Sequence, residues 1–232
     1  MFKIKVKIIR AVCLMIITVM SAVLAGCSDN DGTAPIQFSG GKNIRLARIN
    51  FKDYGSVTFR LYKDEEPELV ERFIDACKNG LYDGIPVGNV IEDYILMAGS
   101  DPVNPDYDAE YEHKGNLYPF KGALCASGSG EKKRNTSAFQ IIGIDKESLK
   151  NLEELIEHKG YTFSDYIKFG YDTEITHEEL EMFMEYGGAP WLTGHAAVFG
   201  QAYEGLDVLE KVITAYNEDE ETEIIIDSIE TD

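Results

Sequence analysis

Apolar residues along the chain follow two periods, which separate predicted strands from predicted helices. Within residues 57–61, valine, phenylalanine and leucine alternate with polar residues, which is typical of a strand with one buried face. The segment 44–51 before it is also a predicted strand, and a turn at 53–55 joins the two as a hairpin. Residues 196–202 are apolar almost without interruption, which predicts a strand buried on both faces.

Two segments instead carry an apolar residue every three or four positions, the period of an amphipathic helix. In the first, Pro67 stands in the first helical turn and Gly80 can end the helix. The second begins at Leu206. The segments 101–121, acidic and rich in tyrosine, and 127–137, rich in glycine, serine and lysine, are predicted as surface loops. Shorter apolar segments predict further strands at 85–100 (a pair), 122–126, 139–144 and 221–229.

Residues 145–190 are predicted to form a helical insertion packed beside the segment that begins at Trp191. The leucines at positions 149, 152 and 155 mark one amphipathic helix. Thr176 and Glu179 have the spacing of a capping box, which predicts the start of a second helix.

The first 26 residues are predicted to be an export signal rather than part of the fold. Four basic residues precede an apolar stretch at 11–23 that is short for a membrane span. Leu24-Ala25-Gly26-Cys27 then resembles a bacterial lipobox, in which the cysteine is lipidated. We expect a signal peptide at 1–26, a flexible tether at 27–42 starting from lipidated Cys27, and a folded domain at 43–232; an uncleaved anchor helix is the alternative. The domain is then expected outside the cytoplasm, lipid-anchored to a bacterial membrane.

The charge of the chain argues against a nucleic-acid partner. Its formal net charge is −19, and residues 1–26 hold four basic residues and no acidic one, so the remainder is more acidic still. Such a surface repels phosphate backbones, and no cluster of lysine and arginine marks a basic face.

The histidines and cysteines predict neither a metal site nor a cofactor. The four histidines lack the spacing of metal ligands. Cys77 and Cys125 each stand among apolar residues, where a free thiol packs as a small apolar side chain. A disulfide between them stays an alternative.

Three stretches of the chain share a known pattern in a known order. The last runs Trp191-Leu-Thr-Gly-His-Ala-Ala-Val-Phe-Gly-Gln-Ala-Tyr-Glu-Gly-Leu-Asp-Val208. The first combines residues 64–73 with Gly80-Leu-Tyr-Asp-Gly84, and the middle one covers residues 87–100. Together they resemble the cyclophilins, the barrel-type peptidyl-prolyl cis-trans isomerases. The resemblance implies a mostly β fold: a closed antiparallel barrel capped by two helices, with the helical insertion 145–190 before its last strands.

The resemblance also implies a peptide-binding site, and the chain departs from the family pattern at its most important position. The family arginine falls on Asn89; one pocket phenylalanine falls on Tyr94 and the second on Gln140. The family histidine falls on Ala196, with His195 one position earlier. The implied catalytic residues are Asn89 and Tyr94, and the implied substrate-binding residues are Ile95, Met97, Ser127, Phe139, Gln140, Trp191, Leu192 and His195.

Isomerisation of a prolyl bond requires an apolar pocket that binds the proline ring and a hydrogen-bond donor, but no nucleophile, metal or cofactor. The barrier of ~20 kcal/mol comes from amide resonance, and a donor aimed at the imide nitrogen stabilises the twisted state in which resonance is lost. Asn89 can donate, but it is neutral and shorter than arginine. Losing one such donor costs on the order of 3 kcal/mol, about a hundredfold in rate. Arg134, or Lys132 and Lys133, could supply a cation instead.

The sequence therefore predicts a monomeric peptidyl-prolyl isomerase that assists the folding of exported proteins with reduced turnover. Its expected partners are proline-containing peptides or unfolded exported chains. One alternative is a non-catalytic module that binds peptides as a chaperone does. Another is a scaffold whose partner surface is the insertion 145–190.

Overall fold

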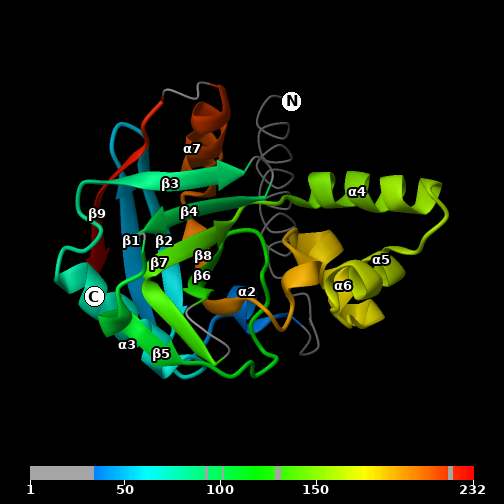
Figure 1. Cartoon of the computed structure of the whole chain (residues 1–232), viewed down its shortest axis with the longest axis horizontal. Helices are drawn as coiled ribbons and strands as arrows, with labels where there is room; N and C mark the ends of the chain where they lie inside the picture. Colours follow the sequence, from blue (N-terminus) through cyan, green and yellow to red (C-terminus); the bar gives the residue numbers. More distant parts are fainter. Residues whose placement is uncertain (1–33, 92–93, 101, 129–131, 219–221) are drawn as a thin grey trace, which may run out of the picture. The chain divides into compact units, whose positions relative to one another are not determined.

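The strands form a closed antiparallel barrel (Figure 1). The computed structural model describes residues 34–91, 94–100, 102–128, 132–218 and 222–232. Within these ranges, eight strands follow the order β4-β3-β9-β1-β2-β8-β6-β7, and the ring closes because β7 pairs back with β4. A short further strand, β5 (Asp108–Glu110), pairs with β7 outside the ring. The barrel strands are β1 (Ile44–Phe51), β2 (Gly55–Tyr62), β3 (Ile85–Ile91), β4 (Ile95–Gly99), β6 (Ala123–Gly128), β7 (Lys133–Ile142), β8 (Ala197–Glu204) and β9 (Ile225–Thr231).

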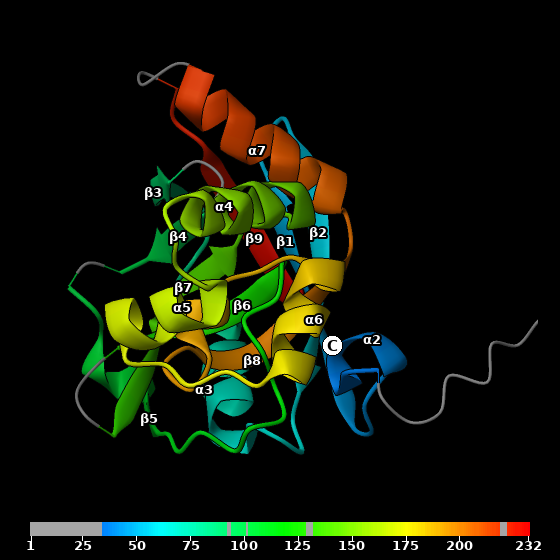
Figure 2. The same cartoon turned by 90° about the vertical axis from the view of Figure 1, so that its right-hand side faces the viewer.

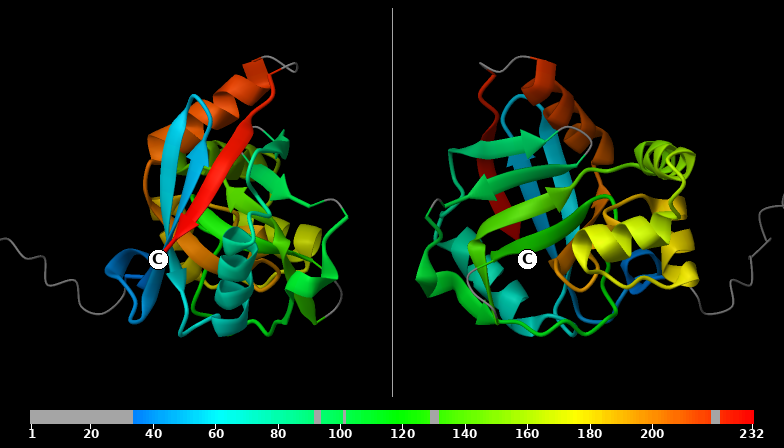
Figure 3. Two further views of the ribbon diagram at one scale, coloured as in Figure 1. Left: turned by 90° about the vertical axis from the view of Figure 1, so that its left-hand side faces the viewer. Right: turned by 45° about the vertical axis from the view of Figure 1, so that its right-hand side comes forward.

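Two helices close the ends of the barrel. Helix α3 (Pro67–Lys78) and helix α7 (Leu206–Glu218) lie over opposite ends (Figure 3). Phe73 of α3 and Leu209 of α7 are buried in the same core cluster as the inward side chains of the strands. Burial of these apolar faces holds the helices on the barrel. The predicted fold, a closed antiparallel barrel with two capping helices, is confirmed.

Two segments predicted as loops contain more ordered packing than their composition indicates. Strand β6 continues to Gly128 and β7 begins at Lys133, so much of the segment 127–137 is strand. In the segment 101–121, Phe120 is fully buried, and its ring centroid lies 4.8 Å from that of Phe183. Phe183 lies far from Phe120 in the sequence, so local composition does not indicate this contact.

The predicted insertion contains the helices α4 (Lys146–His158), α5 (Phe163–Tyr171) and α6 (His177–Tyr186). The predicted capping box is present: the backbone N–H of Thr176 donates to Glu179 Oε2 (2.8 Å) and the backbone N–H of Glu179 donates to Thr176 Oγ1 (3.2 Å). Figure 2 shows the insertion in front of the wall made by β4, β7, β6 and β8. Apolar residues of the helices and of this wall form a second buried cluster, separate from the barrel interior.

The N-terminal boundary of the domain differs from the prediction. Residues 35–42, expected in the flexible tether, pack against the barrel through a short helix, α2 (Ile36–Ser39). Gln37 is 1% exposed; its Nε2 donates to Tyr118 O (2.8 Å) and its Oε1 accepts from the backbone N–H of Tyr118 (2.8 Å). These hydrogen bonds satisfy the buried amide of Gln37. The compact unit begins at Pro35, before the predicted start of the domain at residue 43.

The predicted signal peptide 1–26 and lipidated Cys27 lie outside the described residues. Among the helices that the structure does describe, none combines the length and the apolar character needed to cross a membrane.

Candidate functional site

A row of aligned residues crosses the barrel wall from β3 to β8. Asn89 is paired with Met97, Met97 with Gln140, Gln140 with Cys125, and Cys125 with Val198. The strand neighbours of these residues, such as those at positions 96, 139 and 141, are fully buried inside the barrel. Because side chains alternate between the faces of a strand, the row lies on the outer face. Asn89 is exposed at one end, Met97 and Gln140 are half-buried, and the far end lies under the insertion.

Three aromatic rings pack against one another beside this row. Trp191, in the 3-10 turn η2 (Pro190–Leu192), has its ring 6.1 Å from that of Tyr94 and 5.6 Å from that of Tyr171. Trp191 Nε1 donates to the Tyr94 hydroxyl at 3.5 Å. Thr173 Oγ1 donates to the backbone oxygen of Trp191 at 2.9 Å, which ties the end of α5 to the turn. With the insertion in place, only 7% of Trp191 is exposed.

Two of these residues, Tyr94 and Trp191, line a cavity of about 390 Å³. The other lining residues belong to helix α4 and the segment leading into it. None of the described lining residues carries a formal charge, so the cavity suits an apolar group with a few polar contacts at its rim. The lining consists of Tyr94, Ile144, Ser148, Leu149, Asn151, Leu152 and Trp191.

Most of the predicted site residues lie on this face of the barrel. Tyr94, Met97 and Leu192 pack at the edge of the apolar cluster that contains Trp191. Ile95 belongs to the same cluster but is only 2% exposed, so it supports the site from below. Asn89 lies on the same face, opposite Met97, yet it does not line the cavity.

One predicted substrate-binding residue is wrong. Phe139 is fully buried inside the barrel, where its ring lies 5.4 Å from Tyr82 and 5.9 Å from Phe73. Its neighbour Gln140 takes the outward position, and two adjacent residues of a strand cannot both face the groove. Phe139 is therefore a core residue.

The remaining predicted residues lie toward the other end of β7. Ser127 is paired with Asn135, directly beside the pair formed by Gly128 and Arg134. His195 is exposed, and its backbone oxygen accepts from Arg134 Nη2 at 3.4 Å. Ser127 and His195 thus extend the wall rather than line the aromatic cavity.

Arg134 makes its contacts away from Asn89, the position with which the motifs align the family arginine. Its guanidinium lies 5.0 Å from the centre of the Tyr111 ring and donates to the backbone oxygens of Lys133 (2.9 Å) and His195. These contacts lie at the start of β7, whereas Asn89 lies across the wall at the level of Gln140. Lys132 and Lys133 are exposed at the same end as Arg134. The alternative source of a cation is therefore not supported.

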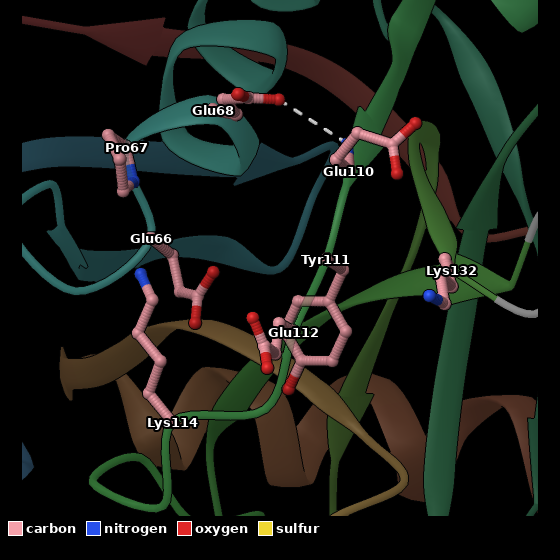
Figure 4. A pocket seen from close by; sticks show the side chains of 8 residues that line it. All are labelled: Glu66, Pro67, Glu68, Glu110, Tyr111, Glu112, Lys114 and Lys132. Carbon is pink, nitrogen blue, oxygen red and sulfur yellow. Dashed lines mark hydrogen bonds between the residues drawn. The ribbon is translucent and has the colours of Figure 1, made fainter.

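A second, polar cavity lies at the start of α3, and no sequence pattern indicates it. It measures about 500 Å³, and Figure 4 shows charged side chains of both signs around it. Glu66 is only 7% exposed, and burial raises the pKa of its carboxyl to about 7, an effect that Lys114 opposes and Glu65 reinforces. The lining consists of Glu66, Pro67, Glu68, Glu110, Tyr111, Glu112, Lys114 and Lys132.

The chemistry available on the outer row is binding and hydrogen-bond donation. Burial raises the pKa of the Cys125 thiol to about 12, so this sulfur stays protonated and unreactive at neutral pH. Cys77 and Cys125 are both free and buried, as the sequence indicates. Among the described residues, no cluster of histidine, cysteine and carboxylate side chains has the geometry of a metal site. The side chain of Asn89 makes no hydrogen bond within the described part of the chain, so its amide can donate to a ligand.

Comparison with known proteins identifies the same family as the motifs. The family description "cyclophilin type peptidyl-prolyl cis-trans isomerase/CLD" matches residues 46–231. A relative from Staphylococcus epidermidis, named for peptidyl-prolyl cis-trans isomerase activity, is 31% identical over 166 residues, which cover 68% of this chain and 76% of the relative. A similarly named relative from Staphylococcus saprophyticus is 29% identical over 201 residues, or 82% of this chain and 92% of the relative.

Solved structures support the fold. A cyclophilin-type isomerase from Cryptosporidium parvum aligns with a TM-score of 0.51 and 16% identity, over 82% of this chain and 98% of the other. The structure of that isomerase in the presence of the dipeptide Ala-Pro aligns with a TM-score of 0.52 and 18% identity, over 79% and 96% of the two chains.

Proposed function

The chain belongs to the cyclophilin-type peptidyl-prolyl cis-trans isomerases, and from this premise we propose that it catalyses isomerisation of prolyl bonds in exported proteins, with reduced turnover. Its substrates would be proline-containing segments of unfolded or extended chains. The reduced rate would follow from Asn89, which stands where the family has arginine.

The observation that carries the proposal is the aligned row of Asn89, Met97 and Gln140 on the outer barrel wall. An amide donor stands at one end of the row, and apolar surface from Met97 and Tyr94 lies beside it. A proline ring held on this surface would bring its imide nitrogen near a donor, which is what the twisted state requires. Asn89 supplies a neutral hydrogen bond, weaker than the charge-assisted bond of a guanidinium.

Exchange spectroscopy by NMR tests the proposal directly. Cis and trans signals of an Ala-Pro peptide are followed at increasing concentrations of the protein. We expect exchange to accelerate in proportion to protein concentration. The matched control is Asn89→Leu, which keeps the size of the side chain and removes the donor, and should lower the acceleration by about tenfold or more. No acceleration by the wild-type protein at high concentration would contradict the catalytic proposal.

A second candidate function is peptide binding without catalysis. It is favoured by Gln140, which replaces an apolar ring on the row and weakens the grip on a proline. Saturable peptide binding combined with unchanged exchange rates would support this candidate instead of the isomerase.

Export and membrane anchoring are part of the same proposal and rest on the sequence alone. The support is the basic and apolar stretch that ends in Leu24-Ala25-Gly26-Cys27. In a bacterial host, we expect the protein in the membrane fraction, and Cys27→Ala should move it out of that fraction. Mass spectrometry of the N-terminal peptide should find Cys27 lipidated; an unmodified Cys27 in the intact chain would contradict the proposal.

A further inference from the structure

The polar cavity lies between three segments of the chain: the start of α3, strand β5 with the residues after it, and the residue before β7. Hydrogen bonds tie these segments together. The backbone N–H of Glu110 donates to Glu68 Oε2 at 3.3 Å, and the backbone N–H of Tyr111 donates to the backbone oxygen of Lys132 at 3.0 Å. The cavity is therefore held in place by the fold.

Glu66 is a buried carboxyl that points into this cavity without a hydrogen-bond partner. It is only 7% exposed, and Figure 4 shows its side chain among the other lining residues. It holds the N-cap position of α3, yet its side chain makes no capping hydrogen bond. Lys114 attracts the carboxyl group but donates its own hydrogen bond to the backbone oxygen of Glu65.

Within the described part of the chain, the Glu66 carboxyl group accepts no hydrogen bond and forms no salt bridge. Burial of a carboxylate costs free energy unless a hydrogen-bond donor or a cation accompanies it. The missing partner therefore points to a ligand that brings a donor into the cavity.

The charges around Glu66 favour a cation over an anion. Among the described lining residues, the carboxylates are those of Glu66, Glu68, Glu110 and Glu112, and the ammonium groups are those of Lys114 and Lys132. When all of these groups are ionised, negative charge is in excess. The whole chain has a formal net charge of −19, which also attracts cations.

An organic cation fits this cavity better than a metal ion does. Among the described residues, no group of three histidine, cysteine or carboxylate side chains is arranged to hold a metal. A guanidinium group presents five N–H donors in one plane, so it can bond to Glu66 and to a second carboxylate of the lining. The volume of about 500 Å³ can hold an arginine side chain.

We infer that the polar cavity at the start of α3 is a binding site for a guanidinium group, which pairs with the Glu66 carboxylate. Two sources share this chemistry, an arginine residue of another polypeptide and free arginine. The inference does not rest on the proposed function, because this cavity shares no described lining residue with the aromatic cavity or with the Asn89 row.

Calorimetric titration tests the inference with N-acetyl-argininamide as the probe and N-acetyl-citrullinamide as its neutral control of similar shape. At pH 8, we expect the arginine compound to bind about tenfold or more tightly than the citrulline compound. Equal affinities would overturn the inference. Titration of a capped Ala-Arg-Ala peptide beside free arginine separates the two sources, and the natural source is the one that binds more tightly.

Three variants locate the binding. Glu66→Gln keeps the size of the side chain and should abolish the preference for arginine over citrulline. The matched control is Glu71→Gln, which removes the same charge from an exposed position of α3 outside the cavity and should keep the preference. An equal loss in both variants would contradict a site at Glu66.

The third variant, Lys114→Met, distinguishes a cationic from an anionic ligand. It removes the cation that attracts Glu66, so argininamide should bind more tightly than it does to the wild type. Weaker binding of argininamide to Lys114→Met would overturn the inference.

The pH dependence of binding gives a last check. Burial raises the pKa of Glu66 to about 7, so the affinity for N-acetyl-argininamide should rise between pH 6 and pH 8 as this carboxyl loses its proton. The rise should be absent in Glu66→Gln. The other ionisable groups around this carboxyl are those of Glu65, Glu68, Glu110, Tyr111, Glu112, Lys114 and Lys132. An equal rise in the wild type and in Glu66→Gln would assign the effect to one of these groups and contradict the role of Glu66.

Discussion

The inner and outer faces of the barrel strands differ in burial and in the role that we propose for them. On β4 and β7, the inward residues Leu96, Phe139 and Ile141 are fully buried apolar side chains of the core. On the outward face, Asn89 of β3 and Gln140 of β7 are the residues that the motifs align with the arginine and the phenylalanine of the family. The inner face forms the packed core of the barrel, whereas the outer face is the one that we propose binds peptide.

The largest expected difference between the two faces is in stability. Phe139→Ala should lower the free energy of unfolding by about 3–5 kcal/mol, because it opens a cavity in the core. Gln140→Ala, one position along the same strand, should change it by less than about 0.5 kcal/mol, because this half-buried side chain lies outside the barrel. Urea denaturation measures both values. Similar losses in the two variants would break the comparison.

A buried carboxyl at the end of the barrel gives a smaller, pH-dependent effect. Burial raises the pKa of Glu66 from its ordinary value of 4.5 to about 7, so the folded state binds more protons than the unfolded state between these values. Stability is therefore lost as pH rises through this window. At pH 8, Glu66→Gln should be more stable than the wild type by about 1–2 kcal/mol. This is less than the full pKa shift implies, because water in the cavity screens part of the charge. At pH 4 the two proteins should differ little in stability.

Thermal or urea unfolding at several pH values checks this prediction. Glu68→Gln is the matched control, because Glu68 is exposed in the same cavity. A stability difference between Glu66→Gln and the wild type that stays constant from pH 4 to pH 8 would show that Glu66 is not the titrating group.

The smallest expected effect concerns the insertion, which covers the outer face of the barrel near Trp191. Tyr171→Ala removes the ring stacked on Trp191 and should destabilise the protein by about 1 kcal/mol. It should also shift Trp191 emission to longer wavelength, because the indole becomes more exposed to water. Tyr161→Ala, which removes a 65% exposed ring of the same insertion, is the control and should leave the emission unchanged. An unchanged emission in Tyr171→Ala would mean that the stack does not shield Trp191.

Much of the fold could be predicted from local patterns. Alternation and continuous apolar runs predict the strands, and Pro67, Gly80 and the capping box at Thr176 predict helix ends that the structure contains. These signals are local because they depend on backbone geometry within a few residues. The pairing of Tyr94 with Trp191 follows from the motifs, since both positions belong to one groove in the family.

Contacts made across long sequence separations could not be predicted in this way. Gln37 is buried against Tyr118, 81 residues away, and no nearby residue indicates this. The stacking of Tyr171 on Trp191 likewise depends on how the insertion packs. The prediction for Phe139 is wrong for a local reason instead: since Gln140 aligns with an outward ring, the period of a strand places Phe139 inside.

The measurement that tests the central claim most directly is the prolyl exchange rate of Asn89→Arg beside that of the wild type. If the outer row is an isomerase site that lacks only its charged donor, the variant should accelerate exchange by about a hundredfold more than the wild type, with an unchanged free energy of unfolding. A folded Asn89→Arg variant with no gain in exchange rate would contradict the claim that this row is the catalytic site.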